Sequence, residues 1–185
     1  MMTTATDAFA NPSRRSWWTK TAPLLGKADA LLRKTADLLS PVADLLARYW
    51  VASAFFSSGL TKTVSGSFTL FGHTFHYPLS VLPTESTFSL FEYEYQVPLL
   101  PSTLAAYLGT AAELLLPVLL LLGLGTRYAA LALFVFNIVA VVSYPDLMGA
   151  GLAQHQVWGL LLLITFCHGP GKLSLDQLIG RLVRR

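Results

Sequence analysis

Apolar residues along the chain gather into blocks of about twenty, longer than the apolar segments of a soluble core. The blocks cover residues 42–64, 103–123, 128–147 and 151–168. At about 1.5 Å per helical residue, each block can cross roughly 30 Å of hydrocarbon. The first block is the most polar, because it carries Arg48 and Lys62. We therefore predict an all-α membrane protein built as a four-transmembrane-helix bundle.

The segment before the first block predicts two further pieces. Residues 1–22 are polar and basic, and we expect a flexible arm on anionic lipid rather than an export signal, because no unbroken apolar stretch follows the arginine pair. Residues 23–39 place leucines at helical spacing with charges between them. This spacing predicts an amphipathic interfacial helix, on the membrane surface or on a partner's helix. Ser40 and Pro41 have the residue types of an N-cap and a first helical residue, so a new helix is expected there.

Residues 65–102 form a long segment, dense in aromatic residues, between the first two blocks. The alternation in residues 91–97, FEYEYQV, predicts a short extended segment. Residues 67–78, SFTLFGHTFHYP, are expected to pair with it and to turn near Gly72. Together they would make a small extracytoplasmic aromatic cap over the mouth of the bundle.

Composition and charge agree with a membrane and set the topology. Hydrophobic residues make up 54% of the chain and charged residues only 12%, against roughly 25% charged in soluble domains. Every Lys and Arg except Lys62 lies on one side of the expected bundle, so both termini are predicted to be cytoplasmic. The net charge of +3 therefore reflects topology and does not indicate a nucleic-acid partner.

The same pattern predicts the domain organisation. Residues 1–40 would be the cytoplasmic basic arm and amphipathic helix, residues 41–180 the four-span membrane domain, and residues 181–185 a basic cytoplasmic tail. Cys167 is the single cysteine of the chain. An intrachain disulfide and a CxxC relay are therefore excluded, and any redox role must pass through a partner or a cofactor.

Glu113 is a carboxylate in the middle of the second block, where a charge costs at least about 2.5 kcal/mol. It shares a helical face with small residues, so it is expected to point into the bundle and to be neutral or paired with a cation. Arg48 and Lys62 lie on one face of the first block, and either could reach it. The pair could fix helix register only, or it could serve proton transfer or ligand binding.

Other polar residues extend the candidate site. Asn137 lies at about the depth of Glu113, and His155 and Trp158 lie in the last block. We predict a cluster of Lys62, Glu113, Asn137 and His155 inside the bundle. Arg127, in the turn between two blocks, is interpreted first as a topology anchor. Two loop histidines could join His155 in a metal or haem site, but no ligand pattern accompanies them, so no metal centre is predicted. These two histidines are His73 and His76.

Several short motifs together resemble the DoxX family of small four-helix bacterial inner-membrane proteins. They are GLTK at Gly59–Lys62, AAELLLPVLLLLGLGTR at Ala111–Arg127, His155 early in the last block, and GPGKLSLD at Gly169–Asp176. The resemblance covers about residues 45–180. The order and spacing of these motifs are more specific to the family than any single motif is.

The resemblance implies a multi-pass protein of the bacterial inner membrane that is tied to redox chemistry. Members resemble the membrane subunit of a thiosulfate:quinone oxidoreductase, partners in thiol and oxidative-stress complexes, or companions of copper-peptide maturation. It implies roles for Lys62, Glu113, Arg127 and His155. We take Lys62, Glu113 and His155 as candidate catalytic residues.

The candidate cofactor-binding residues are Arg48, Arg127, Asn137 and Trp158. Quinone is the favoured ligand over haem or metal, and whether the chain is itself an enzyme stays open. The expected partners are the lipid bilayer, a soluble oxidoreductase or redox subunit, and a second copy of the chain as an alternative. The competing hypothesis is a non-catalytic membrane scaffold that anchors soluble oxidoreductases or metal-peptide maturation enzymes.

Overall fold

The computed structural model describes residues 12–184, with side chains from residue 25 onward. The chain divides into two compact units between Ser40 and Pro41. The expected arm falls partly on residues 1–11, which lie outside the described residues.

Helix α1 runs from Pro12 to Thr61. Residues 12–22 are therefore helical, and the prediction of a flexible arm is wrong for them. The predicted helix start at Ser40 is also wrong, because the Ser40 hydroxyl donates to the Asp37 carbonyl 3.4 Å away instead of capping a new helix. Between residues 25 and 39 the leucines of the amphipathic stripe are exposed. Arg33 and Asp29 form an exposed ion pair one turn apart, with Nε and Oδ2 2.8 Å apart.

Within the described residues, three helices are long and apolar enough to cross a membrane. They are α3 (Ser102–Leu122), α4 (Thr126–Ser143) and α5 (Ala150–His168). Residues 41–61 of α1 are too polar to join them on composition, but they contribute Val51 and Phe55 to one buried core with Leu120, Leu133 and Leu162. The protein is thus a helical, multi-pass membrane protein, and a fourth crossing by α1 stays a prediction.

A β-hairpin and a short helix lie between α1 and α3. Strand β1 (Thr63–Leu70) pairs antiparallel with β2 (His73–Pro83). The turn falls at Phe71 and Gly72, both with positive φ, where the sequence predicted it. The predicted pairing with residues 91–97 is wrong, because β1 pairs with β2. Helix α2 (Glu85–Tyr93) and irregular residues follow in place of the predicted strand at 91–97.

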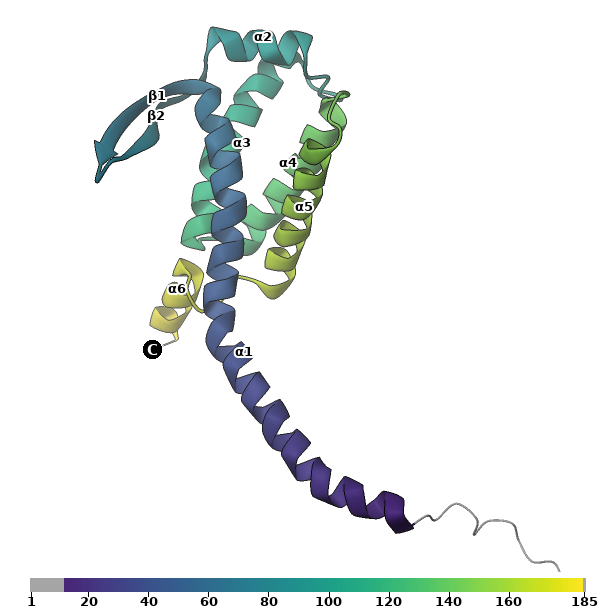
Figure 1. Ribbon diagram of the computed structural model, residues 1–185. Coiled ribbons are helices and arrows are strands. Elements are labelled where there is room, and N and C mark those ends of the chain that lie inside the picture. The colour runs from purple at the N-terminus through teal and green to yellow at the C-terminus, as the bar shows by residue number, and fades with distance from the viewer. Residues whose placement is uncertain (1–11, 185) are drawn as a thin grey trace, which may run out of the picture. The chain divides into compact units, whose positions relative to one another are not determined.

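The strand prediction was wrong because the residues around Tyr95 fit two patterns at once, the alternation of a strand and the spacing of a helix. Phe88, Phe91 and Tyr95 recur at helical spacing, and this face packs on Ala105 and Ala106 of α3. Burial of that aromatic face favours the helix over the alternating pattern. Figure 1 shows α2 across one end of the bundle and the hairpin projecting to its side.

Helix α6 (Leu175–Val183) lies at the other end of the bundle (Figure 1). Asp176 holds the turn between α3 and α4 there, accepting hydrogen bonds from the backbone N–H groups of Gly125 and Thr126 at 2.7 and 2.8 Å and from the Thr126 hydroxyl at 2.8 Å. Partial burial opposes ionisation of Asp176, but these bonds and the charge of Arg48 outweigh it and lower the pKa of the carboxyl. Gly123 adopts the left-handed conformation that ends α3.

Candidate functional site

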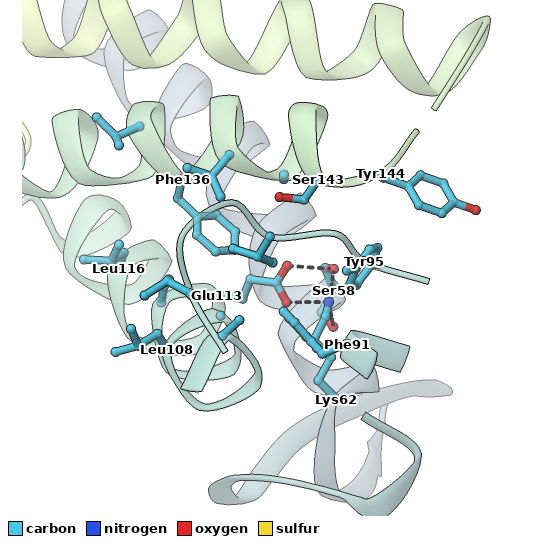
Figure 2. Close-up of a pocket in the computed structure, with 18 of the residues that line it drawn as sticks. Ser58, Lys62, Phe91, Tyr95, Leu108, Glu113, Leu116, Phe136, Ser143 and Tyr144 are labelled. Atoms are coloured by element: carbon cyan, nitrogen blue, oxygen red, sulfur yellow. Dashed lines mark hydrogen bonds and ion pairs between the residues drawn. The ribbon is translucent and has the colours of Figure 1, made fainter. Parts of the chain in front are cut away.

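Lys62 and Glu113 form a buried ion pair. Lys62 follows the last residue of α1, and Glu113 lies in the middle of α3. The Lys62 ammonium donates to Glu113 Oε2 at 2.6 Å and to the Ser58 hydroxyl at 2.9 Å, while that hydroxyl donates to Glu113 Oε1 at 3.2 Å. The dashed lines in Figure 2 mark this triangle. The structure thereby selects Lys62 over Arg48 as the cation beside Glu113.

Gly59 allows the two helices to approach closely enough for the pair. A Cβ at this position would lie 2.9 Å from Leu114 Cδ2 and 3.1 Å from the Glu113 backbone. A larger residue would therefore push α1 away from α3. The small residue and the ion pair belong to one contact between α1 and α3.

The triangle faces a cavity of about 560 Å³ between α3 and α4. Ser58, Lys62 and Glu113 supply polar atoms on one wall, and alanine, valine, leucine and phenylalanine side chains cover most of the rest. Figure 2 shows these side chains around the carboxylate. The cavity is thus apolar with a charged, hydrogen-bonded wall.

The segment after α2 closes one side of the cavity. Tyr95 packs edge-on against Phe91 at 5.0 Å and against Tyr144 at 5.6 Å between ring centroids. The Gln96 N–H donates to the Ser143 carbonyl at 2.8 Å and so ties this segment to the end of α4. Burial first, and then the charge of Glu113, raise the pKa of Tyr95, so its hydroxyl is neutral at physiological pH.

Asn137 of α4 and His155 of α5 form a second polar pair. Asn137 Oδ1 lies 2.8 Å from His155 Nδ1, and Asn137 Nδ2 donates to the His155 carbonyl at 3.0 Å. Gly159 gives the amide room, because a Cβ there would lie 3.2 Å from Nδ2. Trp158 packs edge-on against the His155 ring at 4.8 Å. His155 lines the same cavity as Lys62 and Glu113.

The predicted cluster is therefore present as two hydrogen-bonded pairs, Lys62 with Glu113 and Asn137 with His155. The two predicted arginines lie elsewhere. Arg48 donates to the carbonyls of Leu120, Leu121 and Leu173 at the α6 end of the bundle. Arg127 donates weakly to the Cys167 carbonyl at 3.5 Å, and neither arginine lines the cavity.

His73 and His76 are exposed on β2. Side chains alternate along a strand, so residues three apart point to opposite faces. Among the described residues, no group of three His, Cys, Asp or Glu side chains is placed to hold a metal ion. These histidines therefore do not assemble a ligand set with His155.

Sequence reasoning did not assign Ser58, Tyr95 or Ser143 to the site. Ser58 had a signal, because it lies one helical turn before Lys62 on the same face. Tyr95 was expected on a strand, and nothing local marks Ser143. Ser143 lines the cavity, and its buried hydroxyl has no hydrogen-bond partner among the described residues.

The family model described as DoxX matches residues 43–145, more than half of the chain. The chain belongs to the DoxX family. An uncharacterized protein of Haemophilus influenzae is 28% identical over 155 residues, which is 80% of this chain and 91% of that relative. No solved structure matches. The DoxX match includes Lys62, Glu113 and Asn137 and ends before His155.

Proposed function

We propose that this DoxX protein is an inner-membrane subunit of a redox system and binds a quinone headgroup in the cavity between α3 and α4. The main support for the proposal is that the ion pair faces the cavity. A pair that only fixed helix register would be sealed between helices, whereas Ser58, Lys62 and Glu113 all line the cavity.

The cavity suits an amphiphile. Its volume of about 560 Å³ falls within the roughly 300 to 1,000 Å³ of ordinary ligand sites. A quinone has a flat polar head and an apolar tail, which match the charged wall and the apolar remainder. The Lys62 ammonium would donate a hydrogen bond to a headgroup oxygen, as cations do to anionic or carbonyl acceptors.

Reduction of a quinone to a hydroquinone consumes two electrons and two protons. With one cysteine in the chain, the electrons would come from a partner oxidoreductase. Glu113, between Lys62 and Ser58, would hold and pass protons at the headgroup. Oxidative, thiol or metal stress would be the setting in which such a partner operates.

Binding of a short-chain benzoquinone to the purified chain in lipid nanodiscs tests the proposal. Glu113→Gln leaves the Lys62 ammonium without its counter-charge, so the lysine should lose its proton in the apolar surroundings. Binding should then weaken about tenfold or more, because the hydrogen bond from a charged donor to the headgroup contributes roughly 1.5–3 kcal/mol. Glu92→Gln, an exposed carboxylate outside the cavity, is the matched control and should leave affinity unchanged. A wild-type protein that binds no quinone would refute the proposal.

A scaffold function is the second candidate, favoured by the exposed apolar residues outside the cavity. Leucines are exposed along residues 25–39 of α1, and the hairpin carries no charged residue yet exposes Phe68, Phe71 and Phe75. On this view soluble oxidoreductases or peptide-maturation enzymes dock on these surfaces. Deletion of residues 1–40 would then abolish complex assembly, and Glu113→Gln would lower stability without changing assembly.

A further inference from the structure

The contacts of Asn137 fix the orientation of its amide. The His155 backbone carbonyl can only accept a hydrogen bond, so the group 3.0 Å from it must be the Asn137 amide nitrogen. The amide oxygen then faces His155 Nδ1 at 2.8 Å. The opposite orientation would place two acceptors, the amide oxygen and the His155 carbonyl oxygen, against each other.

This orientation fixes the tautomer of His155. The Asn137 oxygen can only accept, so His155 Nδ1 carries the proton. The part of the chain that the structure describes places no carboxylate in an ion pair with His155. A charged ring is costly in a membrane-spanning helix. The ring is therefore neutral, with an unprotonated Nε2 that can only accept a hydrogen bond.

Nε2 has no protein partner among the described residues and belongs to a ring that lines the cavity. Asn137 occupies Nδ1 and is not itself a cavity-lining residue, so Nε2 is the ring nitrogen that remains for a ligand. Ser143 is a second cavity-lining residue with a polar atom that lacks a protein partner among the described residues. The residue is only 3% exposed, and this atom is its buried hydroxyl oxygen. Figure 2 shows it on the α4 side, across the cavity from Lys62.

We propose that His155 Nε2 accepts a hydrogen bond from a ligand hydroxyl and that the cavity therefore binds a hydroquinone in preference to the corresponding quinone. Asn137 is the positioning residue that sets this acceptor. The inference rests on the proposed function, because it assigns the favoured redox form of the same ligand. Only the hydroquinone carries hydroxyl protons for Nε2, whereas a quinone carbonyl would face a second acceptor there.

The preference has a consequence for the chemistry of the bound headgroup. A site that binds the reduced form more tightly makes the bound quinone easier to reduce, by thermodynamic linkage. For a two-electron couple, each tenfold of preference raises the potential by about 30 mV. Tighter binding of the hydroquinone therefore suits a site where a bound quinone receives electrons from a partner protein.

The test compares affinities of a decyl-substituted benzohydroquinone and its oxidised benzoquinone, measured anaerobically by calorimetry on the full chain in nanodiscs. Wild-type protein should bind the hydroquinone about fivefold to tenfold more tightly, the range expected for one hydrogen bond to a neutral acceptor. His155→Phe should abolish the preference by weakening hydroquinone binding alone. His155→Gln keeps an acceptor oxygen and should restore part of it, and His73→Phe on the exposed hairpin is the control.

The tautomer is tested separately by nitrogen NMR on histidine-labelled protein. His155 should show a protonated Nδ1 and an unprotonated Nε2, and Asn137→Leu should give a mixture of tautomers together with a smaller hydroquinone preference. Equal affinity of wild-type protein for both forms, or an Nε2-protonated ring, would overturn this inference while leaving the proposed function standing. Absence of binding by either form would instead remove both.

Discussion

At the scale of single residues, the site depends on a few polar atoms that lie within hydrogen-bonding distance of one another. The Lys62 ammonium and the Glu113 carboxylate are each buried, and Ser58 bridges them. Two unpaired charges in such a place would be far costlier than the pair. Tyr95 lines the same cavity without adding charge, because burial and the charge of Glu113 raise the pKa of its hydroxyl.

Removing one member of the pair should therefore be worse than removing both. Lys62→Met leaves the Glu113 carboxylate without its cation, and we expect a loss of about 3–5 kcal/mol in the free energy of unfolding. The double variant Lys62→Met with Glu113→Leu should regain most of that loss. Unfolding of the reconstituted protein by a denaturing detergent measures both. A double variant less stable than either single variant would contradict the expectation.

At the scale of elements, the turn between α3 and α4 is held from outside by α6. Asp176 caps the first residues of α4 while its own N–H donates to the Gly123 carbonyl at 2.9 Å. This clasp positions α3 against α4 at the end opposite α2. The cavity lies between the same two helices but toward the other end, where Phe91, Tyr95 and Ser143 line it.

The clasp should depend on pH through Asp176. The pKa of Asp176 is lowered in the folded state from its ordinary value of 3.8, so its stabilisation is present above that value and is lost as pH falls through the folded pKa. Between about pH 5 and pH 3, the melting temperature of wild-type protein should fall more than that of Asp176→Asn. Parallel melting curves for the two proteins over this range would show that the carboxylate contributes nothing to the pH dependence.

At the scale of the whole molecule, the apolar block at residues 42–64 predicts a fourth span, of which α1 forms residues 42–61. The distribution of Lys and Arg sets its direction. Both termini and the inner turn would then be cytoplasmic, with the hairpin on the opposite side. The chain offers a clean assay, because Cys167 is its single cysteine.

Cysteines placed at Gly26 and Ser67 in a Cys167→Ser background test this topology. A membrane-impermeant maleimide should label Ser67→Cys in intact spheroplasts and Gly26→Cys only after the membrane is opened. Both positions are exposed, and a side chain at Gly26 would meet no atom within 4 Å. Labelling of both positions from outside would show that residues 42–61 do not cross.

The sequence was most informative about positions that depend on the geometry of a single helix. Helical spacing placed Glu113 on a packing face and put Lys62 within reach, and depth along the spans brought Asn137 and His155 together. It could not choose between Lys62 and Arg48, because that choice depends on the carbonyls that engage Arg48 at the far end of the bundle. The strand predicted around Tyr95 is wrong because these residues fit both strand alternation and helical spacing. Packing of the aromatic side chains on α3 favours the helix.

The hairpin begins and ends at one point. The Lys62 carbonyl accepts hydrogen bonds from the Thr84 N–H at 3.1 Å and from the Thr87 hydroxyl at 2.8 Å. The chain therefore leaves the bundle at residue 62 and returns to the same place, so the excursion is closed at its base. Such a segment can be lengthened, shortened or exchanged at little conformational cost. A change in the length of its far turn, at Phe71 and Gly72, is therefore expected to leave the helices beneath the hairpin in place.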